Sequence, residues 1–377
     1  MMKRLVLAGA GHAHLNVLKS LVRKRWPGVE VILISPHDRQ IYSGMVPGWM
    51  AGHYRLAQCA ADLLPLAHAA GVRFIQDSVL GLDAGKREIV TARSGTLAYD
   101  VLSLDTGAAI DTDSLAATDA RFLPIRPLEA FVAAWTGALA AAKAKGRAHL
   151  LVVGGGAAGV ELALAARYRL AQEIGAANAI VSLISGSDLL PGHGKGIVSS
   201  VTESLARQGV VAYAGRAVGC PEGVQLADGR IIAADSVIAA TGVKPAEWLA
   251  ASGLALATDG FIAVGDGQQS VSHAAVFAAG DVATRVDAPH AKSGVYAVRA
   301  GPVLAANLQR AIHGEAPLSY VPQKRSLYLL ATGPREAILS WGPLSARGRW
   351  VWKWKDWIDQ RFMRQYDLGP ETCPGES

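Results

Sequence analysis

Residues 5–18 read LVLAGAGHAHLNVL, and this stretch decides the fold that the sequence predicts. A short apolar run ends at Gly9-Ala10-Gly11, and apolar residues at helical spacing follow it. A strand, a glycine turn and a helix in this order are typical of a dinucleotide-binding unit. The glycines let the backbone approach a pyrophosphate, and the helix N-terminus contributes partial positive charge. His14 stands where the third glycine is expected, so this copy of the motif is incomplete.

The motif recurs in full at residues 150–170, LLVVGGGAAGVELALAARYRL. Gly154, Gly156 and Gly159 occupy the three glycine positions, and Glu161 follows them. The second copy begins about 145 residues after the first, so the chain contains an internal repeat. Two copies in one chain are a much stronger signal than either copy alone.

Both units depart from the usual pattern at the end of their second strand. An acid that binds a ribose hydroxyl is usual there, but Ser35 and Ser185 stand at these places. Asp38 and Asp188 follow three residues later, and Asp38 is either a ribose ligand or a solvated loop residue. In the second unit no carboxylate would repel a 2′-phosphate, yet no arginine stands beside Ser185. The sequence leaves NADH and NADPH both open.

Composition limits the class of protein. The 377 residues are 51% hydrophobic and 18% charged, which is enough for two or three domains with buried cores. No apolar run is long enough to cross a bilayer, and we expect a cytoplasmic protein. Cys59, Cys220 and Cys373 are too far apart for a metal cluster or a disulfide framework. The formal charge is +6 without a recognition motif, so no nucleic-acid partner is expected.

Three further motifs follow in a fixed order, namely Thr106-Gly107, Ala240-Thr241-Gly242 and Gly280-Asp281. An aspartate that ends a strand before a helix can accept a hydrogen bond from a hydroxyl group of a ligand. With the two glycine motifs, these residues resemble the flavoproteins with two dinucleotide-binding domains. That superfamily includes the pyridine nucleotide-disulfide oxidoreductases, type II NADH dehydrogenases and sulfide:quinone oxidoreductases. The resemblance covers roughly residues 3–312.

A closer resemblance is to the NADH-dehydrogenase-like module found fused to selenide, water dikinase. It rests on HAH at 12–14, YSGMVPG at 42–48, SLDTG at 103–107, GVYAVRAGPVLAANL at 294–308 and WKWKDWIDQRFM at 352–363. The sequence contains no kinase half.

The resemblance implies an α/β fold with two Rossmann-like domains, one inserted in the other. We expect an FAD-binding domain at residues 1–110 and 250–318, an NAD(P)-binding domain at 111–249, and a C-terminal segment at 319–377. The insertion follows because Asp281 has to return to a site that begins at Gly9.

By the same resemblance the first unit binds FAD and the second binds NAD(P)H as substrate. Hydride would pass from the nicotinamide to the flavin, with His12 at the pyrophosphate of FAD and Asp281 on its ribityl chain. The candidate cofactor-binding residues are Gly9, Gly11, His12, Ser35, Thr106, Gly107, Gly154, Gly156, Gly159, Thr241, Gly242, Gly280 and Asp281.

Two residues are candidates for catalysis. Glu161 would lie at the junction of nicotinamide and flavin, or it is an acid favoured by the dipole of its helix. Lys292 would place positive charge beside the reduced flavin, or it is a solvated loop lysine.

The electron acceptor is left open. Disulfide reductases carry a cysteine pair where this sequence has Gly44-Met45-Val46-Pro47, so a dithiol relay is excluded. The acceptor is then a quinone or another small molecule. The alternative is a flavin module that acts in selenium or sulfur metabolism with a partner such as selenide, water dikinase.

The segment at 347–366, RGRWVWKWKDWIDQRFMRQY, carries six basic and two acidic residues. We expect Trp350, Trp352 and Trp354 to alternate as a strand, and a helix to follow with its aromatic residues on one face. That face comprises Trp354, Trp357, Ile358, Phe362 and Tyr366, and the basic residues Lys355, Arg361 and Arg364 lie elsewhere on the helix. Such a helix suits a membrane surface near a lipid-soluble quinone. The alternative is that the aromatic residues pack over the flavin.

Overall fold

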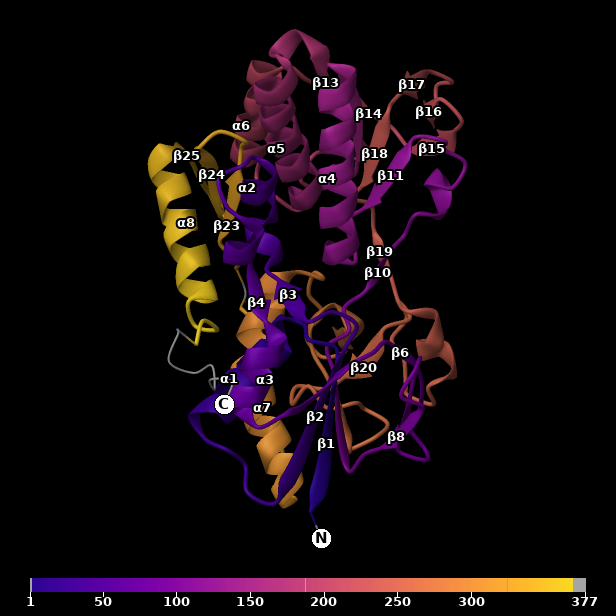
Figure 1. Ribbon diagram of the computed structural model, residues 1–377, viewed down its shortest axis with the longest axis vertical. Coiled ribbons are helices and arrows are strands. Elements are labelled where there is room, and N and C mark those ends of the chain that lie inside the picture. Colours follow the sequence, from indigo (N-terminus) through magenta and orange to yellow (C-terminus); the bar gives the residue numbers. More distant parts are fainter. Residues whose placement is uncertain (1, 187, 324, 369–377) are drawn as a thin grey trace, which may run out of the picture.

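The computed structural model describes residues 2–186, 188–323 and 325–368. Its framework is two five-stranded parallel sheets that lie one above the other (Figure 1). The first sheet has the order β21-β9-β1-β2-β5. Its strands are β1 (Lys3–Ala8), β2 (Val29–Ser35), β5 (Arg73–Gln76), β9 (Val101–Leu104) and β21 (Val276–Ala278).

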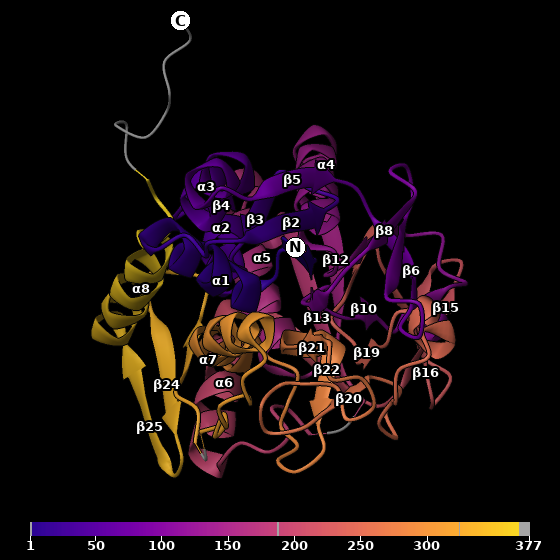
Figure 2. The same cartoon turned by 90° about the horizontal axis from the view of Figure 1, so that it is seen from below.

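Both faces of the first sheet are covered. Leu5 and Leu7 of β1 are fully buried against the helices α1 (His12–Arg23), α3 (Leu63–Ala70) and α7 (Gly294–His313). Val6 and Ala8 point to a second core under β6 (Val79–Asp83), β7 (Glu88–Thr91) and β8 (Thr96–Ala98). Figure 2 shows the three helices on one side of the strands and β6 and β8 on the other. A parallel strand covered on both faces is apolar throughout, which explains the unbroken run at 5–8.

The second sheet repeats this plan with the order β11-β18-β12-β13-β14. Its strands are β11 (Arg121–Pro124), β12 (Ala148–Val153), β13 (Ala179–Ser185), β14 (Val210–Ala214) and β18 (Ser236–Ala239). The helices α4 (Leu128–Lys145), α5 (Ala157–Ile174) and α6 (Lys195–Gln208) cover one face. The small sheet of β15 (Ala217–Cys220), β16 (Gly223–Leu226) and β17 (Ile231–Ala233) covers the other. The predicted fold class, α/β with two Rossmann-like units, is confirmed.

The chain crosses between the two sheets twice, and the crossings pair with each other. β10 (Ala109–Ile110) and β19 (Val243–Lys244) form an antiparallel ladder between the sheets (Figure 1). The second sheet is therefore built entirely from residues that lie between β9 and β21 of the first.

Smaller elements complete the fold. The strands are β3 (Arg39–Ile41), β4 (Ala60–Asp62), β20 (Ile262–Val264) and β22 (Ala283–Arg285), and the remaining α-helix of this part is α2 (Val46–Met50). The 3₁₀ helices are η1 (Ser43–Met45), η2 (Leu56–Cys59), η3 (Asp113–Leu115), η4 (Ala176–Asn178), η5 (Glu247–Ala251) and η6 (Gly280–Val282).

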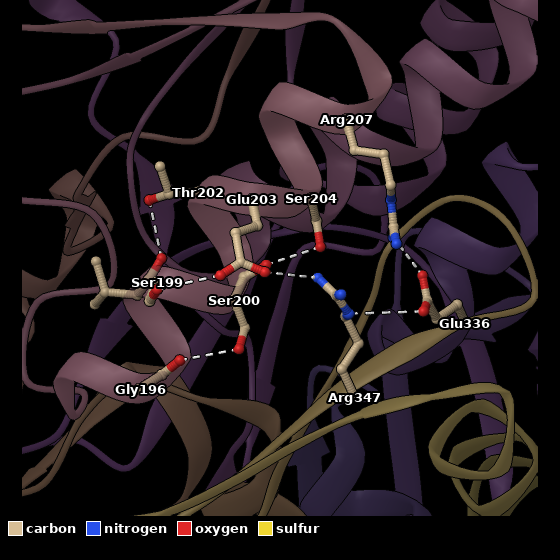
Figure 3. Close-up of polar contacts among 10 residues, drawn as sticks. Gly196, Ser199, Ser200, Thr202, Glu203, Ser204, Arg207, Glu336 and Arg347 are labelled. Atoms are coloured by element: carbon tan, nitrogen blue, oxygen red, sulfur yellow. Dashed lines mark hydrogen bonds and ion pairs between the residues drawn. The ribbon is translucent and has the colours of Figure 1, made fainter.

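The C-terminal segment forms an antiparallel sheet and a helix beside the second unit. Its elements are β23 (Tyr328–Ala331), β24 (Ala337–Trp341), β25 (Leu344–Gly348) and α8 (Arg349–Met363). Figure 3 shows the ion pairs that fix this sheet to α6. Arg207 pairs with Glu336 at 2.5 Å, and Arg347 lies 3.3 Å from Glu203 and 3.7 Å from Glu336. A shared network holds its side chains with less loss of freedom than separate surface pairs.

The expected strand at Trp350–Trp354 is wrong. β25 ends at Gly348, whose φ of 153° turns the chain, and α8 begins at the next residue. Trp350 and Trp354 therefore lie one helical turn apart on the exposed side, whereas Val351 is buried. Within the described residues, no helix combines the length and apolarity needed to cross a membrane.

Candidate functional site

Three glycines of the first unit pack closely against one residue, Asp105. Gly9 has a φ of +87°, and a Cβ at this position would lie 2.4 Å from the backbone oxygen of Asp105. A Cβ at Gly11 would lie 2.3 Å from Oδ1 of Asp105, and one at Gly280 would lie 2.6 Å from the same atom. Only glycine, which lacks a Cβ, can lie this close to Asp105. The packing of Asp105 therefore explains why three of the predicted positions are glycine.

Asp105 caps the helix that begins at this turn. Its Oδ2 accepts hydrogen bonds from the backbone N–H groups of Ala13 at 2.8 Å and His14 at 2.9 Å. These amides lie in the first turn of α1, where they have no partner within the helix. Burial raises the pKa of Asp105 to about 7, although the two backbone N–H groups oppose the shift. The sequence predicted the neighbouring Thr106 and Gly107 as site residues, but it did not predict this role of Asp105.

His14 fills the place of the missing glycine. Its Nδ1 donates to the carbonyl of Gly9, and its Nε2 lies 2.8 Å from Oγ of Ser103, which donates to it. The ring is fully buried, and burial lowers its pKa to about 4. His14 is therefore a neutral side chain that locks the turn.

His12 has an imidazole nitrogen without a partner. Nε2 is buried and makes no hydrogen bond with any residue that the structure describes. Burial lowers the pKa of His12 to about 4, so the ring is neutral at pH 7. The ring lies beside Tyr42, with 5.5 Å between the centroids. An unpaired buried nitrogen at a helix N-terminus is a group that a bound phosphate oxygen would satisfy.

Asp281 is linked to the second unit. Its Oδ2 lies 2.5 Å from Nη2 of Arg126, which follows β11, and Asp281 is 8% exposed. Arg126 was not predicted, because it lies about 155 residues from Asp281 in the sequence. The pair brings one charge from each unit to the space between the two sheets.

The serines at the ends of β2 and β13 make similar hydrogen bonds. Ser35 Oγ donates to the carbonyl of His37 at 3.0 Å, and Ser185 Oγ donates to the carbonyl of Asp188 at 3.3 Å. Both serines are 5% exposed. Each hydroxyl thus holds the turn that follows its strand. Thr106 lies exposed at the end of β9, and Gly107 has a φ of +74°.

Of the three motif glycines in the second unit, two are closely packed and one is open. A Cβ at Gly154 would lie 2.0 Å from the carbonyl oxygen of Ala240, and one at Gly159 would lie 1.8 Å from that of Gly154. A Cβ at Gly156 would meet nothing within 4 Å. The open position lies at the N-cap of α5, where a pyrophosphate is expected.

Thr241 and Gly242 hold the crossing between the sheets. Thr241 Oγ1 donates to the carbonyl of Asp111, and the carbonyl of Gly242 accepts from the N–H of Asp111 at 2.9 Å. Their contacts are with the chain that leaves the first sheet.

Glu161 belongs to a buried charged cluster. Its Oε1 accepts the backbone N–H of Ala331 in β23 at 2.7 Å. Burial raises the pKa of Glu161 to about 7, and the charge of Lys355 opposes the shift. Lys355 Nζ donates to Oδ2 of Asp359 at 2.7 Å and to the carbonyl of Gly44 at 2.7 Å.

The prediction that grouped Lys355 with the other basic residues of the last helix is wrong. Its side chain is 12% exposed and faces inward. Burial alone would lower the pKa of Lys355, but Asp359 and Glu161 outweigh burial and raise it. Lys355 reaches the turn at Gly44-Met45, where its Nζ donates to the carbonyl of Gly44. The cluster thus joins the first unit, the second unit and the C-terminal segment.

Lys292 makes several contacts of its own. Its Nζ donates to the carbonyl of Ala283 and to Oγ1 of Thr284, each at 2.6 Å, and lies 3.8 Å from the centroid of the Phe261 ring. Burial lowers its pKa. These contacts hold β22 to the start of α7, and the catalytic role of Lys292 stays a prediction.

The cysteines of the described residues are separate thiols. Cys59 is fully buried, and burial raises its pKa to about 12, so it stays protonated. Cys220 lies in β15, and Cys373 is outside the described residues. Met45 is 1% exposed. Within the described part of the chain, no group of residues could hold a metal ion.

These residues fit two dinucleotides. Each parallel sheet carries a glycine turn and a helix N-terminus at the carboxyl end of one strand, β1 or β12, which is where such folds bind ligands. The unpaired Nε2 of His12 suits the phosphates of FAD in the first unit. The open position at Gly156 suits the pyrophosphate of NAD(P)H in the second.

A protein-family model described as pyridine nucleotide-disulphide oxidoreductase matches residues 3–301. No curated protein matches the sequence. The sulfide:quinone oxidoreductase of the hyperthermophilic bacterium Aquifex aeolicus has a similar structure, with a TM-score of 0.80 and 16% identity over 97% of this chain and 91% of that one.

Two further solved structures are similar. A ferredoxin reductase from Rhodopseudomonas palustris has a TM-score of 0.73 and 22% identity over 89% of this chain and 81% of that one. The water-forming NADH oxidase from Lactobacillus brevis has a TM-score of 0.73 and 19% identity over 90% of this chain and 75% of that one. At these identities the structures establish the fold alone.

We expect Asp105→Ala to lower the free energy of unfolding by about 1–2 kcal/mol, the usual effect of removing a helix cap. Denaturant unfolding of the variant and the wild type measures the change. Asp38→Ala is the control, because Asp38 is an exposed aspartate that pairs only with Arg39 among the described residues. Equal losses in the two variants would show that the cap is not needed.

Glu161→Gln should change how stability depends on pH. A folded-state pKa of about 7, above the ordinary value of 4.5 for glutamate, means that the folded protein binds the proton more tightly. Glu161 therefore destabilises the wild type progressively as pH rises from 4.5 to 7, by roughly 3 kcal/mol in all. Glutamine keeps an oxygen that accepts the N–H of Ala331 but does not titrate. The free energy of unfolding of the variant should therefore rise relative to that of the wild type as pH increases. Exposed Glu222→Gln is the control, and parallel pH profiles for all three proteins would refute the assignment.

Proposed function

Because the chain belongs to the pyridine nucleotide-disulphide oxidoreductase family and is an FAD-dependent NAD(P)H oxidoreductase, we propose that it passes electrons to a small acceptor without a redox-active disulfide. The observation that carries this proposal is the pair of glycine turns at the carboxyl ends of β1 and β12. Met45, in place of a cysteine, supports the absence of a dithiol relay.

In this proposal the first unit holds FAD and the second holds NAD(P)H. His12 would donate to a phosphate of FAD, and Asp281 would accept a hydroxyl hydrogen bond from its ribityl chain. When bound, FAD accepts a hydride from NAD(P)H and passes electrons on singly or in pairs. Arg126, which pairs with Asp281, lies between the units and would face the phosphates of either dinucleotide.

In this proposal the cluster around Glu161 would supply a proton donor beside the electron-transfer site. Glu161 has a pKa near 7, so it can hold or release a proton at neutral pH. Lys355 keeps a positive charge next to it, and this charge favours any anion that forms nearby. The catalytic assignment of Glu161 rests on this placement.

We propose a lipid-soluble quinone as the acceptor and a membrane surface as its source. Trp350, Trp354 and Trp357 of α8 are 56%, 38% and 51% exposed and lie at positions i, i+4 and i+7. Arg361 and Lys353 are exposed on the same helix, and the guanidinium of Arg361 lies over the ring of Trp357. Indole rings with neighbouring cations suit the headgroup region of an anionic bilayer.

A second candidate is a flavin module in selenium or sulfur metabolism that works with a partner such as selenide, water dikinase. The sequence motifs at 42–48, 103–107 and 294–308 favour it, because they resemble the module fused to that kinase. Slow reduction by NAD(P)H together with tight binding to a separate kinase would support this candidate over the first.

Gly156→Val should keep FAD bound and prevent reduction by NAD(P)H. The φ of Gly156 is −74° and its Cβ direction is open, so valine fits the fold but fills the space proposed for the pyrophosphate. Anaerobic stopped-flow absorbance of the flavin measures the rate. Gly194→Val is a matched control, since Gly194 is also a helix N-cap with a φ of −70°. Reduction of both variants at the wild-type rate would exclude the second unit as the nicotinamide site.

The double variant Trp354→Ser and Trp357→Ser should lose binding to anionic vesicles, because both indole rings are exposed. Cosedimentation at low and high salt measures binding, and salt should weaken the wild-type interaction. Val211→Ser, on an exposed residue of β14, is the control. Wild-type protein that never sediments with anionic vesicles would remove the physical argument for a quinone from the bilayer.

A further inference from the structure

The end of β13 in the second unit decides which nicotinamide dinucleotide the chain accepts, and the sequence left this point open. In dinucleotide-binding folds the ribose next to the adenine lies where the second strand of the unit ends. NAD and NADP differ there by one phosphate group, which carries roughly two negative charges at pH 7. The charges that surround Ser185 therefore determine the preference.

β14 brings a cation to this place. β13 and β14 are parallel, Ser185 pairs with Ala214, and the N–H of Gly215 donates to the carbonyl of Ser185 at 2.8 Å. Arg216 follows directly. A Cβ built on Gly186 would lie 3.9 Å from Cγ of Arg216, so the stem of the arginine passes over the backbone that follows Ser185.

Arg216 has free hydrogen-bonding capacity. Its side chain is exposed, and it forms no ion pair with the other described residues. The other arginine of this edge is already engaged, because Arg230 pairs with Asp228 at 2.7 Å and lies over the ring of Tyr213. A planar guanidinium with several donors is the side chain best suited to a phosphate group.

The usual acid is replaced by a hydroxyl that is turned to the protein. Ser185 is 5% exposed and donates to the carbonyl of Asp188, so no carboxylate stands at the strand end to repel a phosphate. Gly186 adds no side chain between the backbone and Arg216. The acid closest along the chain is Asp188, which is exposed and lies beyond the turn. Asp228, at the same edge, is paired with Arg230.

We propose that the second unit prefers NADPH to NADH, and that Arg216 is the residue that recognises the 2′-phosphate. This inference rests on the proposed function, because it assigns a substrate to the same nicotinamide site. Asp188 is the competing determinant, since an acid at this place would accept a hydrogen bond from the 2′-hydroxyl of NADH.

Binding of nucleotide fragments to the flavin-loaded protein tests the assignment without any turnover. Titration calorimetry with adenosine 2′,5′-bisphosphate and with 5′-AMP compares the two ribose forms directly. We expect the bisphosphate to bind about tenfold or more tightly, as loss of a charge-assisted hydrogen bond would predict. Arg216→Gln should abolish that advantage and leave 5′-AMP binding unchanged. High salt should reduce it, because Arg216 is exposed.

Two controls separate Arg216 from its neighbours. Arg230→Gln removes a cation from the same edge of the sheet and should not alter either affinity. Asp188→Asn should not weaken 5′-AMP binding. A wild type that binds 5′-AMP as tightly as the bisphosphate, or an Arg216→Gln variant that keeps the advantage, would overturn the proposal, as would weaker 5′-AMP binding in Asp188→Asn.

Reduction kinetics show whether a negative result rejects only the preference for NADPH or also the proposed function. We expect anaerobic flavin reduction to show a higher kcat/KM with NADPH than with NADH, and Arg216→Gln to remove the difference. Rapid reduction by NADH with no effect of Arg216→Gln would reject the preference for NADPH and retain the oxidoreductase. Reduction by neither nucleotide would reject both.

Discussion

The close approach of three glycines to Asp105 is the constraint on which the first unit depends. Gly9, Gly11 and Gly280 come from two distant segments. A Cβ at Gly9 would meet the backbone of Asp105, and one at Gly11 or Gly280 would meet its carboxylate. The carboxylate replaces solvent at the first turn of α1 and fixes the helix relative to β9. The second unit has Ala240 at the corresponding place after β18, so its turn is packed against a backbone carbonyl and its helix N-terminus has no carboxylate cap. Asp105 is thus one difference between the two units, beside His14 in place of the third glycine.

The sequence predicted what is encoded locally. Glycine spacing and apolar runs identified both strand-turn-helix units, because these patterns depend on neighbours within a few residues. Asp105 and Arg126 were missed, since they act on Ala13 and Asp281, about 90 and 155 residues away, and no local pattern marks such pairings. The inward position of Lys355 was missed for another reason: a helix wheel assigns lysine to the solvent side, whereas its partner Asp359 lies one turn further on the same face.

The serines at the strand ends of the two units have the same structural role. Ser35 and Ser185 stand where a ribose ligand is usual, yet both hydroxyls hold the turns that follow their strands. In the second unit our proposal assigns recognition of the ribose phosphate to a side chain that follows the neighbouring strand, and sequence spacing along one strand does not reveal such a residue. A distant residue also reaches Gly44, whose carbonyl accepts a hydrogen bond from Lys355 of the last described helix.

The cluster at Lys355 also sets an order of assembly. Protein chains are synthesised from the N-terminus, and domains generally fold as units as they emerge. Gly44 and Glu161 are made long before α8, so both sheets can form while the space between them is still open to solvent. The lysine that joins them arrives only with the last described helix. We therefore expect a nascent chain to pass through a stage in which both units are folded and Lys355 is not yet in place, and a large cofactor could enter at that stage.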